Sequence, residues 1–363
     1  MKNELDFKLL NYIPDPVLPN CKPLCQIKNY ILFNKIGQGT FSKVYLSIDI
    51  NTNKKYAVKR ISLNVLKHYP NVISQLDREI RLLNKFNHEN IQKMIEVLMS
   101  KTGRYIYLVL EYAECGSIES LLDKGNVISI KSIRSIIKQI TNALNYIHSK
   151  KYVHQDIKPG NILLNSKGKA ILCDFGIGHT FGSANMVVGS PAYQAPEAIK
   201  DSSDDDSNDD KTLYEKEDIW SLGVTLYKML FNKLPFNGKN LFEIIENIKV
   251  KPLLIPKSNF EVPEKLLRGM LQINPHQRYS LEDVMNDPFV KYADDSAHDL
   301  VIINQKPIEI SSNIVKIEVT NCKIDSFLFQ NLINPKEMLF NKARPISLPS
   351  PLVGEVQSEH SFE

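Results

Sequence analysis

Hydrophobic positions divide the chain into a first part that predicts strands and a longer second part that predicts helices. Apolar and polar residues alternate from Asn29 to Val44 around a pair of glycines, and strand-like runs follow at Tyr56–Ile61 and Tyr105–Tyr112. A period of two residues is typical of strands. Between these runs, Val72–Phe86 carries apolar residues at helical spacing and predicts a helix.

Helical patterns dominate the second part. Long amphipathic stretches occur at Ile130–Ser149, Asp218–Leu230 and Leu241–Ile248. A β-rich beginning followed by an α-rich bulk predicts an α+β chain of two lobes with a cleft between them.

Three segments depart from this pattern. Residues 1–27 contain four prolines and no sustained periodicity, so we expect an extended arm. Lys200–Lys211 is an acidic, low-complexity insert that cannot bury itself. Residues 291–363 form a tail that we expect to be partly disordered, although strand-like alternation at 308–330 leaves open a flanking piece that packs on the domain.

Composition restricts the class of protein. The net charge of +4 and a hydrophobic content of 43% give no reason to expect a nucleic-acid or membrane partner. No apolar run approaches the ~18–20 residues that span a bilayer. Five scattered cysteines predict reduced thiols and a location in the cytoplasm or the nucleus. Cys21 and Cys25 have the spacing of half a metal site, but no second pair lies nearby.

The most informative motif is Tyr152–Leu164, YVHQDIKPGNILL, followed by Asp174-Phe175-Gly176. In this order and spacing Asp156 can accept the proton of an attacking hydroxyl, Lys158 can steady a transferring phosphoryl group, and Asn161 and Asp174 can hold Mg²⁺. The motif resembles the catalytic centre of protein kinases. The Lys-Pro pair after the aspartate is the form found in Ser/Thr kinases.

The resemblance implies an ATP site in the first part of the chain. Lys59 would hold the α- and β-phosphates, and as a buried cation it needs a carboxylate partner. Glu79 is favoured as that partner over Asp77, because it lies on the apolar face of its helix. A glycine-rich loop would cover the phosphates, with Phe41 at its tip and Ser42 where a third glycine is usual. The expected nucleotide-binding residues are Ile36, Gly37, Gln38, Gly39, Thr40, Phe41, Ser42, Val44, Ala57, Lys59, Leu110, Glu111, Ala113 and Leu163.

Other residues would support the site rather than catalyse. We expect a buried ion pair between Glu197 and Arg278. Asp218, at the start of the central helix, would hold the backbone of the catalytic loop. Ser190 would bond Asp156 and Lys158 as an architectural hydroxyl, with a phosphorylation site as the less favoured alternative. Every expected charged group is present, which argues against a non-catalytic pseudokinase scaffold.

Gln155 departs from the common kinase pattern. Most regulated kinases have an arginine before the catalytic aspartate, and a phosphate on the activation loop pairs with it. Because Gln155 carries no charge, we expect activity that does not require activation-loop phosphorylation, although Thr180 and Ser183 remain candidate sites.

More specific stretches resemble the liver kinase B type, a family that also lacks this arginine. They are Glu111–Ser117 (EYAECGS), Gly189–Glu197 (GSPAYQAPE), Gly223–Tyr227 (GVTLY), Leu234–Ile248 (LPFNGKNLFEIIENI) and Leu267–Leu271 (LRGML). The resemblance implies a kinase domain at 28–290, with an N-lobe at about 28–111 and a C-lobe at about 114–290. It also implies activation-loop threonines of AMP-activated-kinase-like enzymes as substrates, and a pseudokinase and an armadillo-type scaffold as activators. The acidic insert and the tail after about 293 match nothing known in that family.

The runner-up is a calcium/calmodulin-dependent kinase kinase or another calmodulin-kinase-group enzyme. It is disfavoured because a calmodulin-binding segment should read as a basic amphipathic helix, whereas the sequence of residues 293–330 is not basic and shows strand-like alternation. Modification sites are weaker hypotheses. Ser202, Ser203 and Ser207 each precede an acidic residue at +3, as in a casein-kinase site or simply a solvated loop. Ser347, with Arg344 at −3, suits 14-3-3 capture or is a chance match.

Overall fold

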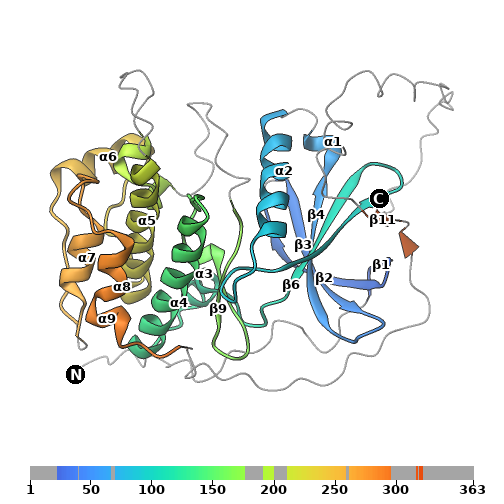
Figure 1. Cartoon of the computed structure of the whole chain (residues 1–363), viewed down its shortest axis with the longest axis horizontal. Coiled ribbons are helices and arrows are strands. Elements are labelled where there is room, and N and C mark those ends of the chain that lie inside the picture. The colour runs from blue at the N-terminus through green and yellow to red at the C-terminus, as the bar shows by residue number, and fades with distance from the viewer. Residues whose placement is uncertain are drawn as a thin grey trace, which may run out of the picture. The chain divides into compact units, whose positions relative to one another are not determined.

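The computed structural model describes residues 23–39, 41–66, 70–175, 191–199, 211–258, 261–295, 316–317 and 319–321. All of these residues belong to one unit of the chain, Met1–Ile324. Strands dominate its first part and helices its second, as the hydrophobic pattern predicts (Figure 1).

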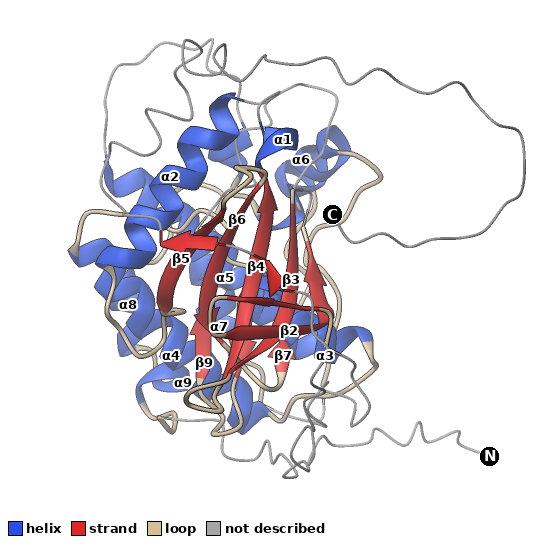
Figure 2. Ribbon diagram, turned by 90° about the vertical axis from the view of Figure 1, so that its right-hand side faces the viewer, coloured by secondary structure: helices blue, strands red, loops and turns tan. Residues whose placement is uncertain are grey.

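The N-lobe is built on a sheet whose strands run β10–β1–β2–β3–β4–β6–β5–β11 in hydrogen-bonding order (Figure 2). Neighbouring strands are antiparallel except for β1 and β10, which are parallel. The helices α1 (Leu63–Leu66) and α2 (Pro70–Lys85) connect β4 to β5. The strands are β1 (Cys25–Ile27), β2 (Tyr30–Gln38), β3 (Ser42–Asp49), β4 (Lys55–Ser62), β5 (Met94–Ser100), β6 (Tyr105–Glu111), β10 (Lys316–Ile317) and β11 (Val319–Asn321).

Register sends neighbouring side chains of this sheet to opposite faces. Val58 pairs with Tyr45 on β3 and with Val109 on β6, and all three belong to one buried cluster. The next row pairs Lys59 with Val44 and Leu108. Because side chains alternate along a strand, this second row faces the other way, toward α2. The sheet therefore presents one lysine to the helix that carries Glu79.

The C-lobe packs helices around α4 and α5. Trp220 on α5 is fully buried and stacks on Phe236. A small sheet of β7, β8 and β9 includes, in β8, the end of the motif Tyr152–Leu164. The elements are β7 (Gly116–Ser117), α3 (Ile118–Asp123), α4 (Ile130–Ser149), η1 (Pro159–Asn161), β8 (Ile162–Leu164), β9 (Ala170–Leu172), η2 (Pro191–Tyr193), η3 (Pro196–Ile199), α5 (Lys211–Phe231), α6 (Leu241–Val250), α7 (Glu264–Met270), α8 (Leu281–Asn286) and α9 (Pro288–Lys291).

Two glycines allow α7 to approach its neighbours closely. A Cβ atom at Gly223 on α5 would lie 2.9 Å from Cβ of Met270, and one at Gly269 would lie 2.5 Å from the ring of Tyr279. Any larger residue at either position would push these elements apart, so both glycines serve packing.

Two sequence expectations about boundaries are wrong. The arm expected at 1–27 ends earlier, because β1 pairs with β2 and buries Cys25 and Ile27 in the N-lobe core. Asp218 does not open the central helix. α5 begins at Lys211, so Asp218 lies two turns inside it.

The tail contributes two strands, both within the stretch 308–330 whose alternation the sequence shows. β10 pairs with β1, and β11 pairs with β5. Ile317 and Val319 pack against the buried cluster of the N-lobe. β1 and β5, at opposite sides of the N-lobe sheet, therefore each gain a partner strand from one short piece of the tail.

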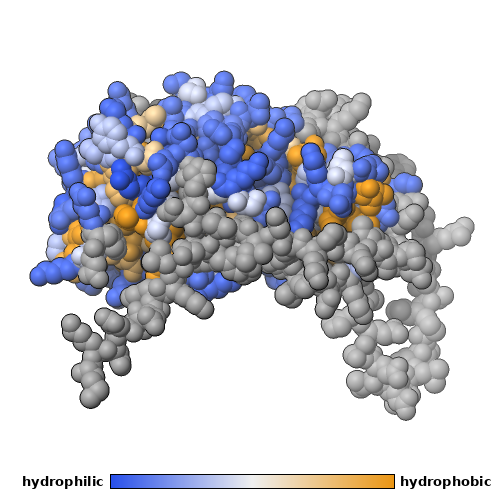
Figure 3. Space-filling view, turned by 90° about the horizontal axis from the view of Figure 1, so that it is seen from below, coloured by the Kyte–Doolittle hydropathy of each residue, from blue (hydrophilic) through white to orange (hydrophobic). Residues whose placement is uncertain are grey.

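The surface is mixed. On the side seen from below, hydrophilic side chains predominate, with smaller apolar areas between them (Figure 3). Among the described residues, α6 leaves Phe242 and Val250 largely exposed. No helix in the described ranges is both long and apolar enough to cross a membrane.

Candidate active site

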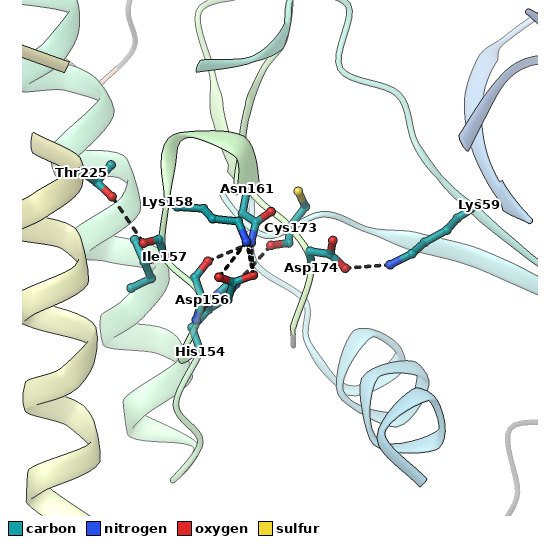
Figure 4. Close-up of polar contacts among 9 residues, drawn as sticks. All are labelled: Lys59, His154, Asp156, Ile157, Lys158, Asn161, Cys173, Asp174 and Thr225. Atoms are coloured by element: carbon teal, nitrogen blue, oxygen red, sulfur yellow. Dashed lines mark hydrogen bonds and ion pairs between the residues drawn. The ribbon is translucent and has the colours of Figure 1, made fainter. Parts of the chain in front are cut away.

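Two side chains of the motif Tyr152–Leu164, those of Lys158 and Asn161, converge on the carboxylate of Asp156 (Figure 4). Nζ of Lys158 lies 2.9 and 2.8 Å from the two carboxylate oxygens of Asp156. Nδ2 of Asn161 donates to Oδ2 of Asp156 at 2.7 Å and to its backbone oxygen at 2.8 Å. These bonds fix the direction of the Asp156 carboxylate before any substrate is present.

The loop that carries Asp156 is held by hydrogen bonds to α5. The fully buried carboxylate of Asp218 accepts hydrogen bonds from the backbone N–H groups of His154 and Gln155, at 2.9 and 2.8 Å. Nε2 of His148 on α4 lies 2.8 Å from the same carboxylate. Gln155 has a φ of 64°, which costs a non-glycine residue roughly 1–2 kcal/mol. The predicted role of Asp218 is confirmed, and its bonds offset this strain.

His154 connects the loop to the segment of Asp174. Its Nε2 lies 3.1 Å from the carbonyl oxygen of Cys173, and the backbone N–H of Cys173 donates to the carbonyl of Asn161. Burial lowers the pKa of His154, so its ring is neutral near pH 7. The ring of Phe175 packs between His154 and Phe86, which follows α2. Catalytic loop, Asp174 and α2 thus form one connected unit.

Lys59 joins the two lobes. Its Nζ lies 2.7 Å from Asp174 and 3.2 Å from Glu79. Burial alone would lower the pKa of Lys59, but the charges of Asp174 and Glu79 raise it above its ordinary value. Lys59 in turn holds the pKa of Asp174 below its usual range. Burial raises the pKa of Glu79, and the positive charge of Lys59 opposes this rise.

The choice between Glu79 and Asp77 is settled by their partners. Asp77 pairs with Arg81 on the partly exposed side of α2, at 2.7 Å. Glu79 is buried, and it forms a salt bridge with Lys59 at 3.2 Å. The ion pair predicted from the sequence is confirmed.

The donors beside Asp156 suit a magnesium ion. Asn161 uses its amide nitrogen on Asp156, which leaves its amide oxygen for a cation. The Asp174 side chain is 44% exposed, although it is bonded to Lys59 through Oδ1. Carboxylate and amide oxygens are hard ligands of the kind Mg²⁺ prefers, together with phosphate oxygens of a nucleotide. The residues present therefore fit the metal.

Apolar side chains of β2, β3, β4, β6 and β8 suit a purine ring. Ala57 and Leu110 are neighbours in register and are buried, whereas Ile36, Val44 and Leu163 are half-buried. Gly39 forms a tight turn, its N–H donating to the carbonyl of Ser42, and a Cβ there would lie 2.9 Å from the Ser42 hydroxyl. Gly37 pairs with Val44 and Gln38 with Lys43, and Phe41 is half-buried. Thr40 lies outside the described residues.

A scan against family models matches residues 30–290 to the protein kinase domain. The chain belongs to the protein kinase family.

Relatives of this kinase include several named Ser/Thr kinases. It is 32% identical to serine/threonine-protein kinase STK11 of Gallus gallus over 297 residues, which cover 80% of this chain and 66% of the relative. It is 33% identical to stk11 of Xenopus laevis over 73% of this chain and 62% of the relative. It is also 30% identical to "Probable serine/threonine-protein kinase MARK-A" of Dictyostelium discoideum, over 86% of this chain and 28% of the relative. The chain thus matches less than two thirds of the length of these relatives.

The connection between the two lobes of the kinase includes a residue that sequence reasoning missed. Glu111 is half-buried and Ala113 is buried, and both were expected to bond a nucleotide through their backbones. The carbonyl of Glu111 accepts a hydrogen bond from Nε2 of Gln92 at 3.1 Å, and the backbone N–H of Gln92 donates to Leu172 in the C-lobe. Gln92 therefore ties the connection to β9. An isolated glutamine in a loop gives no sequence signal for this role.

The activation segment is described only at its end. There Arg278, fully buried, holds both carboxylate oxygens of Glu197 and also lies over the ring of Trp220, which confirms the predicted ion pair. Several residues singled out from the sequence lie outside the described residues, namely Gly176, Thr180, Ser183, Ser190, Ser202, Ser203, Ser207 and Ser347.

Proposed function

We propose that this chain is an ATP-dependent Ser/Thr protein kinase. The observation that carries the proposal is the connected set of Asp156, Lys158, Asn161, Asp174 and Lys59, with Lys59 bonded to Glu79 at the same time. Kinases transfer phosphate only when the lysine–glutamate pair and the metal-binding aspartate are both in place. This arrangement is also the reason for setting aside a pseudokinase.

Each of these residues would have a separate role in phosphate transfer. Asp156 would orient a substrate Ser or Thr hydroxyl and take up its proton as the O–P bond forms. Lys158, now bonded to Asp156, would share its charge with the transferring phosphoryl group. Lys59 would hold the phosphates that remain on the leaving nucleotide. Mg²⁺ held by Asp174 and Asn161 would neutralise phosphate charge. The protein mainly positions the groups and stabilises charge.

Within the Ser/Thr kinases we propose the liver kinase B type. Support comes from the similarity to STK11 proteins over most of this chain and from Gln155 in place of arginine. The substrates would be activation-loop threonines of AMP-activated-kinase-like enzymes. A pseudokinase and an armadillo-type scaffold would be its activators, and the cytoplasm, or also the nucleus, its location.

The test is transfer of phosphate from Mg-ATP to an unphosphorylated AMP-activated-kinase catalytic domain, with Asp174→Asn as the inactive control. We expect modification of the activation-loop threonine by the native chain alone. Transfer to a generic basic peptide but not to this domain would leave a Ser/Thr kinase and remove the liver kinase B assignment. Transfer to neither, even with a pseudokinase and scaffold added, would overturn the proposal.

A further inference from the structure

Two consecutive carboxylates of α5 hold the residue that precedes the catalytic aspartate. Asp218 accepts the backbone N–H of Gln155 at 2.8 Å. Its neighbour Glu217 lines one cavity together with Gln155, and a side-chain hydrogen bond from Gln155 lowers the pKa of Glu217 against the effect of burial. A third residue of the same helix, Thr225, donates to the carbonyl of Ile157 on the far side of Asp156, at 3.4 Å (Figure 4). The catalytic loop therefore rests on one helix at points before and after Asp156.

Gln155 and Glu217 both lie in the wall of one cavity among the described residues. This cavity, of about 430 Å³, is lined among others by Arg78 of α2, Gln155, Phe175, Glu197 and Glu217. It therefore touches the helix that carries Glu79, the catalytic loop and the end of the activation segment. A side chain fixed in its wall is placed to influence all three.

The chemistry of the pair differs from that of a phosphorylation switch. In the usual phosphorylation switch, the arginine before the catalytic aspartate is a buried cation that waits for a phosphate on the activation loop. Gln155 is neutral and finds its carboxylate on α5, in the same lobe. Both halves of the contact are thus permanently present.

We propose that Glu217 is a positioning residue that orients Asp156 by holding the Gln155 side chain, in place of an activation-loop phosphate. The inference rests on the proposed kinase activity but not on the liver kinase B assignment. It concerns the geometry of the catalytic loop, so it applies to any Ser or Thr substrate.

The surroundings of Glu217 make this contact sensitive to pH. Burial raises the pKa of Glu217 to about 7, and the nearby charges of Glu197 and Asp218 add to the rise. The hydrogen bond from Gln155 and the charge of Arg278 oppose it. Arg78, His154 and Tyr214 also line the same cavity. Glu217 therefore ionises near neutral pH, and its ionised form accepts the stronger hydrogen bond from the Gln155 amide.

The experiment compares Glu217→Ala, Glu217→Gln, Gln155→Ala and the double variant Glu217→Ala/Gln155→Ala in the full chain. Glu215→Gln, on the same helix but not in the cavity wall, is the matched control. The first readout is kcat and KM for ATP and a generic Ser/Thr peptide between pH 6 and 8. The second is amide hydrogen exchange of the peptide containing His154–Asp156, which needs no turnover.

We expect Glu217→Ala to lower kcat about fivefold with little change in KM, because it affects orientation rather than binding. The double variant should be no worse than either single one. In the native chain kcat should rise with pH through about 7, and Glu217→Gln should lose this component. Exchange at His154–Asp156 should quicken in Glu217→Ala and stay unchanged in Glu215→Gln.

Unchanged kcat and unchanged exchange in Glu217→Ala would overturn the inference, as would fully additive effects of the two alanine variants. An equal loss in Glu215→Gln would show a general effect on α5 and also count against it. If the native chain transfers phosphate to no substrate, the proposed function fails. The exchange comparison then still decides whether Glu217 holds the loop.

Discussion

Nζ of Lys59 on β4 lies 2.7 Å from Oδ1 of Asp174, so one ion pair joins the N-lobe sheet to the catalytic segment of the C-lobe. The same ammonium also reaches Glu79 on α2, at 3.2 Å. A buried carboxylate such as Glu79 is stable as an anion only while a cation faces it. The position of α2 and the orientation of the Asp174 carboxylate therefore both depend on Lys59.

Lys59→Met should reduce phosphate transfer at least about 100-fold, because it removes a charge that stabilises the transition state. Its effect on stability should depend on pH. Burial already raises the pKa of Glu79, and loss of Lys59 raises it further. At pH 6 Glu79 is largely protonated in the native chain and in the variant alike. At pH 8 the native carboxylate is ionised and paired with Lys59, whereas the variant must either bury it unpaired or protonate it, so the variant should lose more stability at pH 8. Thermal unfolding at both pH values checks this, and equal loss of stability at pH 6 and pH 8 would contradict it.

Arg278→Ala should destabilise the C-lobe by about 3–5 kcal/mol, because it leaves the Glu197 carboxylate without its buried partner. The matched control is Arg268→Ala, whose pair with Glu264 is about half exposed on both sides. An exposed pair contributes at most about 1 kcal/mol. Urea unfolding of both variants measures the difference, and similar midpoints would show that the Glu197 pair adds nothing.

Val319→Asp should loosen the N-lobe at β1 and β5 together. Val319 packs on the buried cluster, and β11 bonds to β5 while β10 bonds to β1. A carboxylate at that position costs about 1–3 kcal/mol unless the strand detaches. Hydrogen exchange should therefore quicken in both strands, since edges that lose their partner are exposed. Removal of Asp325–Glu363 is the control, because it leaves β10 and β11 in place. Unchanged exchange in Val319→Asp would show that the tail strands do not stabilise the sheet.

Phosphatase treatment of the purified chain should leave kcat unchanged, because Gln155 offers no cation for an activation-loop phosphate. The measurement is transfer to a generic peptide before and after treatment, with intact-mass analysis to show that phosphate was removed. A large drop in kcat would mean that another cation of the chain receives the phosphate.

The sequence by itself determined the fold class and the chemistry. Periodicity of two and of 3.6 residues predicts the strands and helices, because long elements bury one face. Asp156, Lys158 and Asn161 are predictable because they stand on one short loop, where spacing along the chain is nearly distance in space. Glu79 could be predicted as the partner of Lys59 for a similar reason, because it lies on the apolar face of its helix.

Only the tertiary structure decided the contacts between distant segments. Gln92 under the connection of the lobes, Glu217 beside Gln155, and the strands β10 and β11 join residues far apart in sequence. Strands of two or three residues are too short to show a period, and a polar side chain in a loop or a solvent-facing turn looks the same as one bonded to a distant partner. Which of them is bonded depends on packing, and packing is specified by the whole chain.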